Sequence, residues 1–118
     1  MFVQDALVSK DFYERVFEVK TVYEDENSAA FKFDNMIVNL LAIPEAHGLI
    51  TPAIVGDASH GSNFQLTIWV DDADAACASL TSKGVSLING PMDRVWGMRT
   101  ACFADPDGHI WEVAQSLN

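Results

Sequence analysis

The sequence has few cysteines, few basic residues and no long apolar stretch, and each shortage excludes a class of protein. Only two of its 118 residues are cysteines, Cys77 and Cys102, and they lie 25 positions apart. This spacing fits neither a disulfide framework nor a zinc knuckle, so we expect both to be small buried residues. No apolar run approaches the roughly 20 residues that a membrane helix requires.

Basic residues are scarce. Seven Lys and Arg stand against seventeen Asp and Glu, which gives a net charge of −10. An acidic surface repels nucleic-acid phosphates and anionic lipid, so we expect neither a nucleic acid nor a membrane as partner. It favours cationic small molecules, although solubility alone also explains it. The N-terminus lacks a secretory signal pattern, so we expect a cytoplasmic location.

Several catalytic motifs are also missing. The chain has no phosphate loop and no dinucleotide fingerprint. The segment Gly61-Ser62-Asn63 lacks the second glycine of a nucleophile elbow. What is present is enough chain for one ordinary domain, with 49% hydrophobic residues. These numbers exclude wholesale disorder.

Apolar periodicity and turn signals predict the same order of elements twice. In the first half we expect a strand, a helix with Ser9 as its N-cap, and three strands. In the second half we expect a strand, a helix that begins at Asp71-Asp72 and ends near Lys83, and three strands. The predicted strands are residues 1–4, 19–23, 29–33 and 36–43, then 64–70, 85–88, 95–103 and 110–113.

Turn residues separate these elements. Residues 44–62, with two prolines and three glycines, predict a linker or loop. Gly90-Pro91 is expected to end a strand, and residues 105–108 (Asp-Pro-Asp-Gly) predict a turn whose glycine has a positive φ. The result is an α+β protein of two βαβββ modules, residues 1–55 and 56–118. Since each is too small to stand alone, we expect one structural domain.

The duplication, the Phe12-Tyr13 pair and the segments 96–99 (Trp-Gly-Met-Arg) and 105–112 (Asp-Pro-Asp-Gly-His-Ile-Trp-Glu) resemble the vicinal-oxygen-chelate superfamily. That group includes glyoxalase I, fosfomycin-resistance enzymes, extradiol dioxygenases and bleomycin-resistance proteins. The resemblance implies curved half-barrel sheets around an internal cavity, and a homodimer.

The superfamily's enzymes hold a divalent metal with ligands from the first and last strands of paired modules. Glu112 matches such a ligand position. The corresponding positions are Asn39 and Gln65, and the fourth falls just before Met1. A catalytic metal typically requires three or more His or carboxylate ligands. We therefore expect no metal cofactor, with one divalent ion as the alternative. The chain resembles the metal-free, antibiotic-binding members.

Strand alternation then places candidate ligand-binding residues on one face. If Glu112 faces the cavity, alternation brings amide and indole side chains to the same side. Aromatic rings stack on planar ligands and attract cations. Structural roles also fit: a tryptophan in the core, amides bonded across the sheet, or an arginine paired with a sheet carboxylate. The candidate set is Asn39, Gln65, Trp69, Trp96, Arg99 and Glu112.

These residues favour a protein that sequesters a small molecule, such as a cationic or planar antibiotic, without metal. One alternative is a metal-dependent lyase, isomerase or dioxygenase of the same superfamily. The other is a metal-free enzyme in which Glu112 acts as general acid or base. Whether the protein is an enzyme stays open at this point, with binding preferred.

Overall fold

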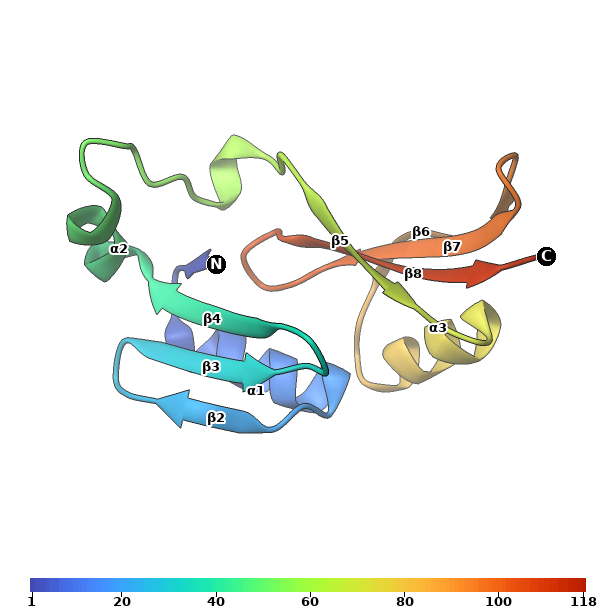
Figure 1. Cartoon of the computed structure of the whole chain (residues 1–118), viewed down its shortest axis with the longest axis horizontal. Helices are drawn as coiled ribbons and strands as arrows, with labels where there is room; N and C mark the ends of the chain where they lie inside the picture. Colours follow the sequence, from blue (N-terminus) through green and yellow to red (C-terminus); the bar gives the residue numbers. More distant parts are fainter. The chain divides into compact units, whose positions relative to one another are not determined.

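The computed structural model describes residues 1–118 and contains two compact units, Met1–Gly61 and Ser62–Asn118. Each unit has an open four-stranded sheet, and a helix packs against one face of that sheet (Figure 1). The α+β class is therefore confirmed. The module boundary between residues 55 and 56, and the grouping into one domain, stay predictions.

The first unit follows the predicted order of elements. Its sheet has the order β1-β4-β3-β2, in which β1 runs parallel to β4 and the other neighbours are antiparallel. A parallel pair needs a long crossover, and α1 lies within that crossover. The elements are β1 (Phe2–Val3), α1 (Ala6–Phe17), β2 (Thr21–Glu24), β3 (Ser28–Lys32) and β4 (Ile37–Ala42).

Helix α1 begins earlier than predicted. Its N-cap is Asp5, whose carboxylate accepts the backbone N–H groups of Leu7 and Val8. The prediction of Ser9 as the cap was wrong: Ser9 lies inside the helix and is 1% exposed. Aspartate is a favourable N-cap because its side chain satisfies donors that lack helical partners. The Tyr13 ring on this helix lies 5.7 Å from the ring of Phe31 on β3.

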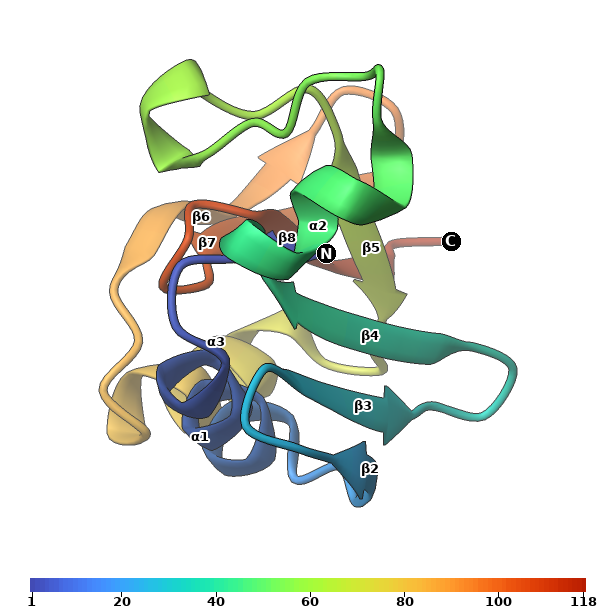
Figure 2. The ribbon, with the colours of Figure 1, turned by 90° about the vertical axis from the view of Figure 1, so that its left-hand side faces the viewer.

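The segment predicted as a loop contains two short helices. Residues Ile43–Ile50 form α2 directly after β4, and Ala58–His60 form the 3-10 turn η1 (Figure 2). Pro44 lies in the first turn of α2, where its missing N–H costs nothing. The loop prediction was therefore wrong for these residues, because proline was interpreted only as a breaker.

The second unit repeats the topology with the order β5-β8-β7-β6, and β5 runs parallel to β8. Helix α3 packs against β6, β7 and β8, and Asp72 caps it as predicted. The turn at residues 105–108 is confirmed, with φ of 84° at Gly108. The elements are β5 (Gln65–Trp69), α3 (Ala73–Ser82), β6 (Leu87–Arg94), β7 (Met98–Ala104) and β8 (Ile110–Ser116).

Two strand boundaries in this unit differ from the prediction. Gly90-Pro91 does not end a strand, because β6 continues to Arg94 with a register shift between Asn89 and Met92. Gly90 has φ of 82°, and a Cβ there would lie 2.7 Å from Ala101 Cα, so only glycine fits. Strand β7 begins at Met98 rather than at residue 95, since residues 95–97 form the hairpin turn.

Each unit buries an aromatic core between its sheet and its helix. Phe31 and Leu40 in the first unit and Phe103 in the second are 0% exposed, and Trp111 is 1% exposed. Both cysteines are free and buried, as expected. No helix in the structure is long and apolar enough to cross a membrane. In the second unit, α3 is the only helix, so the opposite face of that sheet carries no helix of its own unit.

Candidate functional site

The strand register brings polar residues together on the face of the second sheet that α3 does not cover. Glu112 on β8 pairs with Thr67 on β5 and with Cys102 on β7. Cys102 in turn pairs with Asn89 on β6. Residues in register across a sheet point to the same side, so these four side chains form one row. We call this side of the sheet the Glu112 face.

Glu112 is half-buried and bonded to one side chain. The Thr67 hydroxyl donates to its Oε1 atom at 2.9 Å. No Lys, Arg or His lies within ion-pair distance of Glu112 in the structure. Its Oε2 atom is therefore available to accept a hydrogen bond from a bound molecule.

Arg94, at the end of β6, supplies the positive charge of this face. Its Nε atom donates to the Thr100 hydroxyl at 2.9 Å, and its Nη2 atom donates to the Asn89 side-chain oxygen at 3.4 Å. Its guanidinium carbon lies 5.8 Å from the centre of the Trp96 ring. Arg94 was not among the predicted site residues, because the strand was expected to end at Gly90-Pro91, before this residue. Alternation cannot be followed through an unrecognised register shift.

Cys102 lies between these charged groups. Burial raises the pKa of its thiol, the Glu112 carboxylate raises it further, and Arg94 and a hydrogen bond with Asn89 act in the opposite direction. The net shift is upward, so the thiol stays protonated near neutral pH. Glu112 and Arg94 are therefore both close enough to Cys102 to affect the pKa of its thiol.

Comparison with known proteins identifies the family. A family model described as Glyoxalase/Bleomycin resistance protein/Dioxygenase superfamily matches residues 1–113. The chain belongs to this superfamily. A glyoxalase/bleomycin resistance protein/dioxygenase from Nocardioides has a crystal structure that superposes with a TM-score of 0.88 at 21% identity. The match covers 100% of this chain and 80% of that one. The resemblance is thus confirmed, and so are the α+β class and the two βαβββ modules with open sheets; the internal cavity stays a prediction.

Two known proteins are similar to this chain in sequence. An uncharacterized protein of Mycobacterium bovis is 28% identical, and the match covers 99% of this chain and 80% of that protein. The anthracycline biosynthesis protein DnrV of Streptomyces peucetius is 31% identical, and the match covers 92% of this chain but 42% of DnrV. The chain therefore spans less than half the length of DnrV.

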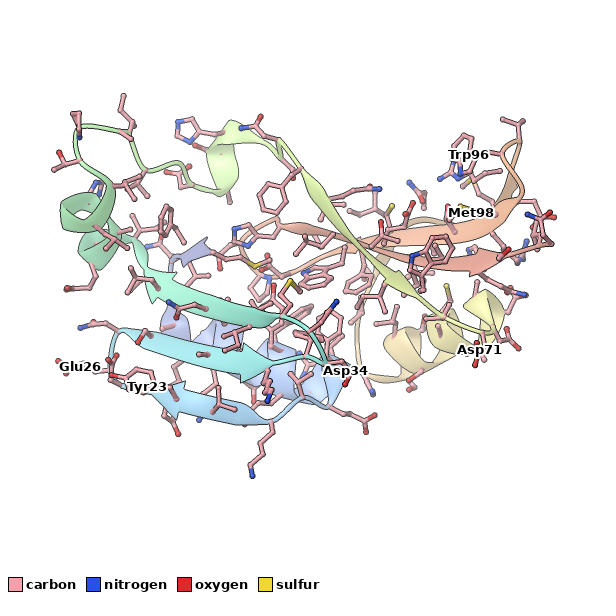
Figure 3. The ribbon with its side chains drawn as sticks, in the orientation of Figure 1. Tyr23, Glu26, Asp34, Asp71, Trp96 and Met98 are labelled. Atoms are coloured by element: carbon pink, nitrogen blue, oxygen red, sulfur yellow. The ribbon has the colours of Figure 1, made fainter.

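The structure brings together some of the predicted site residues. Gln65 and Trp69 lie on β5 on the same side as Glu112, and the Trp69 side chain is 66% exposed. Trp96 lies in the β6–β7 turn, where Figure 3 labels it beside Met98, and it reaches the Glu112 face through Arg94. Whether these residues bind a ligand stays a prediction.

Two predicted residues lie elsewhere. Arg99 is on the opposite side of the second sheet, where it pairs with Asp74 at 2.9 Å and Asp93 at 2.8 Å. The hydrogen bonds that Arg99 donates to Asp74 and Asp93 raise its pKa. Asn39 belongs to the first unit, where it is exposed and pairs in register with Ala30. The expected homodimer and cytoplasmic location stay predictions.

The donors near Glu112 do not fit the divalent metal of the superfamily's enzymes. Glu112 shares its face with hydroxyl, amide, thiol and guanidinium groups, and a guanidinium cannot bind a cation. No three His, Cys, Asp or Glu side chains come close enough to hold a metal ion. Such sites typically use several His or carboxylate ligands.

Proposed function

We propose that the Glu112 face binds a small organic molecule with a planar aromatic ring, and that the protein acts by holding this molecule. One observation carries the proposal. A single sheet presents an acceptor carboxylate, a donor guanidinium and two exposed indole rings on connected positions. Small-molecule sites combine apolar surface with a few polar groups in this way.

The exposed tryptophans support binding. Trp69 is 66% exposed and Trp96 is 62% exposed, although an indole is among the largest apolar side chains. Leaving such rings in water forgoes the burial of about 150–250 Å² each. Exposed apolar surface edged by polar groups is typical of a binding surface. A planar ligand would cover these rings by stacking.

The chemistry of the face favours holding over transformation. The one thiol on it, Cys102, has a raised pKa and is therefore a poor nucleophile at neutral pH. Thr67 donates to Glu112 and has no histidine beside it to act as its base. Binding without bond chemistry needs only the donors, acceptors and rings that are present.

The name of one relative suggests a probe. DnrV is described as an anthracycline biosynthesis protein. Anthracyclines are planar, and their hydroxyl and amino groups could donate to Glu112. Doxorubicin, an anthracycline, and the smaller neutral compound 2-naphthamide therefore test binding of a planar ring with and without additional polar groups.

Isothermal titration calorimetry with both compounds tests the proposal. We expect one saturable site per chain, and we expect Glu112→Gln to weaken doxorubicin about tenfold, because a hydrogen bond to a charged group is lost. Glu26→Gln, an exposed residue of the first unit, should leave the affinity unchanged. Doxorubicin should be recovered intact. Binding of neither compound, equal affinity of Glu112→Gln and the unmodified protein, or chemical conversion of the probe would contradict the proposal.

A further inference from the structure

Arg94 is a half-buried guanidinium that has only neutral hydrogen-bond acceptors. The chain contains seventeen acidic residues against seven basic ones, so a carboxylate partner would be easy to supply. Arg99, on the same β6–β7 hairpin, has two such partners, Asp74 and Asp93. Arg94 instead donates to the Thr100 hydroxyl and the Asn89 amide oxygen. These bonds hold the guanidinium in place, but no carboxylate neutralises its charge.

The geometry of Arg94 is fixed while most of its donors remain available. A guanidinium has five N–H groups. Two of them donate to Thr100 and Asn89, which leaves three for another molecule. Thr100 is 0% exposed, so the acceptor that holds Nε is itself immobilised. A donor fork held in place in this way loses little entropy when it binds an anion.

We infer that Arg94 binds the carboxylate of an aromatic carboxylic acid. This inference rests on the proposed function and names the class of its ligand. The planar guanidinium matches the two oxygens of a carboxylate. The Trp96 ring, 5.8 Å from the guanidinium carbon, provides a surface on which the ligand's ring stacks.

The other charges on the face select a singly charged anion. Glu112 and Arg94 both act electrostatically on Cys102, so the Glu112 carboxylate lies in the same part of the sheet. A doubly charged phosphate there meets more repulsion than a carboxylate does. A hydroxyl or amino group on the ligand's ring can donate to Glu112. The site therefore fits an aromatic monocarboxylate with a donor substituent.

Because the chain is strongly acidic, a preference for an anionic ligand over its neutral analogue would be evidence for a local cation. A net charge of −10 repels anions at long range, so a neutral ligand is expected to bind better than its anionic analogue unless a local cation reverses the order. Arg94 is the one arginine that the structure places on the Glu112 face. A preference for the anion therefore reports on Arg94.

Calorimetry with 2-naphthoate and 2-naphthamide, which share one ring system, tests the inference. We expect the unmodified protein to bind 2-naphthoate at least tenfold more tightly than 2-naphthamide. Arg94→Gln should abolish this preference, because it should weaken binding of 2-naphthoate far more than binding of 2-naphthamide. Arg94→Lys keeps the positive charge but lacks the planar guanidinium, and it should retain part of the preference for 2-naphthoate. Arg15→Gln, an exposed arginine on α1, should retain all of it.

The outcomes separate the inference from the proposed function. Equal affinity of the unmodified protein for both compounds overturns the role of Arg94 but leaves aromatic binding intact. Binding of neither compound overturns both. A preference that persists in Arg94→Gln, or tighter binding of 2-naphthyl phosphate than of 2-naphthoate, overturns the inference. If circular dichroism shows that Arg94→Gln is unfolded, Arg94→Lys replaces it in the test. A full anion preference in folded Arg94→Lys would contradict the inference that the planar guanidinium recognises the carboxylate.

Discussion

The two units share a scaffold but differ on the sheet face that lies opposite α1 in the first unit and opposite α3 in the second. Both sheets have the same strand order and the same mixture of one parallel and two antiparallel pairs. In the first unit, Asn39 pairs with Ala30. At the matching register position of the second unit, Glu112 pairs with Cys102. The first face thus presents an amide and a methyl group where the second presents a carboxylate and a thiol.

This difference separates the residues that make the fold from those that supply chemistry. Phe31 and Phe103 occupy matching positions on β3 and β7, beneath the helix of each unit, and both are 0% exposed. Burial restricts such positions to apolar side chains that fill the available volume. On the other face, Asn39 is exposed and Glu112 is half-buried, so core packing does not restrict these two positions in the same way. At this position the second unit carries a charged side chain and the first unit carries a neutral one.

The largest effect should come from the shared core, and it should be the same in both units. Phe31→Ala and Phe103→Ala each remove a fully buried ring, and we expect each to lower the free energy of unfolding by about 3–5 kcal/mol. Urea denaturation monitored by circular dichroism measures both. Costs that differ by more than about 2 kcal/mol would show that the two cores are not equivalent in packing.

Much of the shared scaffold was predictable from the sequence, because strand alternation, helix caps and turns are set by neighbouring residues. Alternation in β5 and β8 correctly placed Gln65 and Trp69 on the side of Glu112. Asp72 and Gly108 carried specific cap and turn chemistry, and both were confirmed. What failed was interpretation of single residues with two roles. Pro44 lies in the first turn of a helix rather than in a loop, and Ser9 is a buried residue inside a helix rather than its N-cap.

Most of the charged site was not predictable in the same way. Arg94 is brought to Glu112 by pairing across β6, β7 and β8, and the shift between Asn89 and Met92 breaks the alternation that would have revealed it. Arg99 was selected instead, since a bulge at Gly97 would have changed its parity; β7 pairs with β8 without a register shift, and this places Arg99 on the opposite side. Long-range register is a tertiary property, so alternation within one strand does not contain it.

An intermediate effect should come from the irregular strand of each unit. The register of β2 shifts between Thr21 and Tyr23, around the exposed Val22. The register of β6 shifts around Gly90, whose φ is 82° and whose missing Cβ would press on Ala101. We expect Gly90→Ala to cost about 1–3 kcal/mol through backbone strain, and Val22→Ala to cost no more than about 0.5 kcal/mol.

Thermal unfolding of both variants, followed by titration with 2-naphthoate, measures this difference. Gly90→Ala should also weaken 2-naphthoate binding, because the displaced strand carries both Asn89 and Arg94. Val22→Ala should bind as the unmodified protein does. If Gly90→Ala were as stable as Val22→Ala, the close approach of β6 to β7 would not require glycine.

The smallest effect should come from the hairpin ends, which the two units stabilise differently. The β6–β7 turn exposes Trp96, whereas Asp25 organises the β2–β3 turn. Figure 3 labels Tyr23 and Glu26, the residues on either side of Asp25 in this region of the sequence. Asp25 accepts hydrogen bonds from the Tyr23 hydroxyl at 2.7 Å, the Asn27 N–H at 2.8 Å and the Ser28 hydroxyl at 3.0 Å. These bonds, that of Tyr23 first, lower the pKa of Asp25.

A lowered pKa in the folded state fixes the sign of the pH dependence. The stabilisation by Asp25 is fully present above the ordinary aspartate pKa of about 3.9, and it is lost as the pH falls through the lowered folded value. The stability difference between the unmodified protein and Asp25→Asn should therefore be constant from pH 7 to 5 and shrink below pH 4. Urea midpoints across this range measure it, with exposed Asp34→Asn as control. A difference that grows on acidification would show that the charge of Asp25 does not hold the turn.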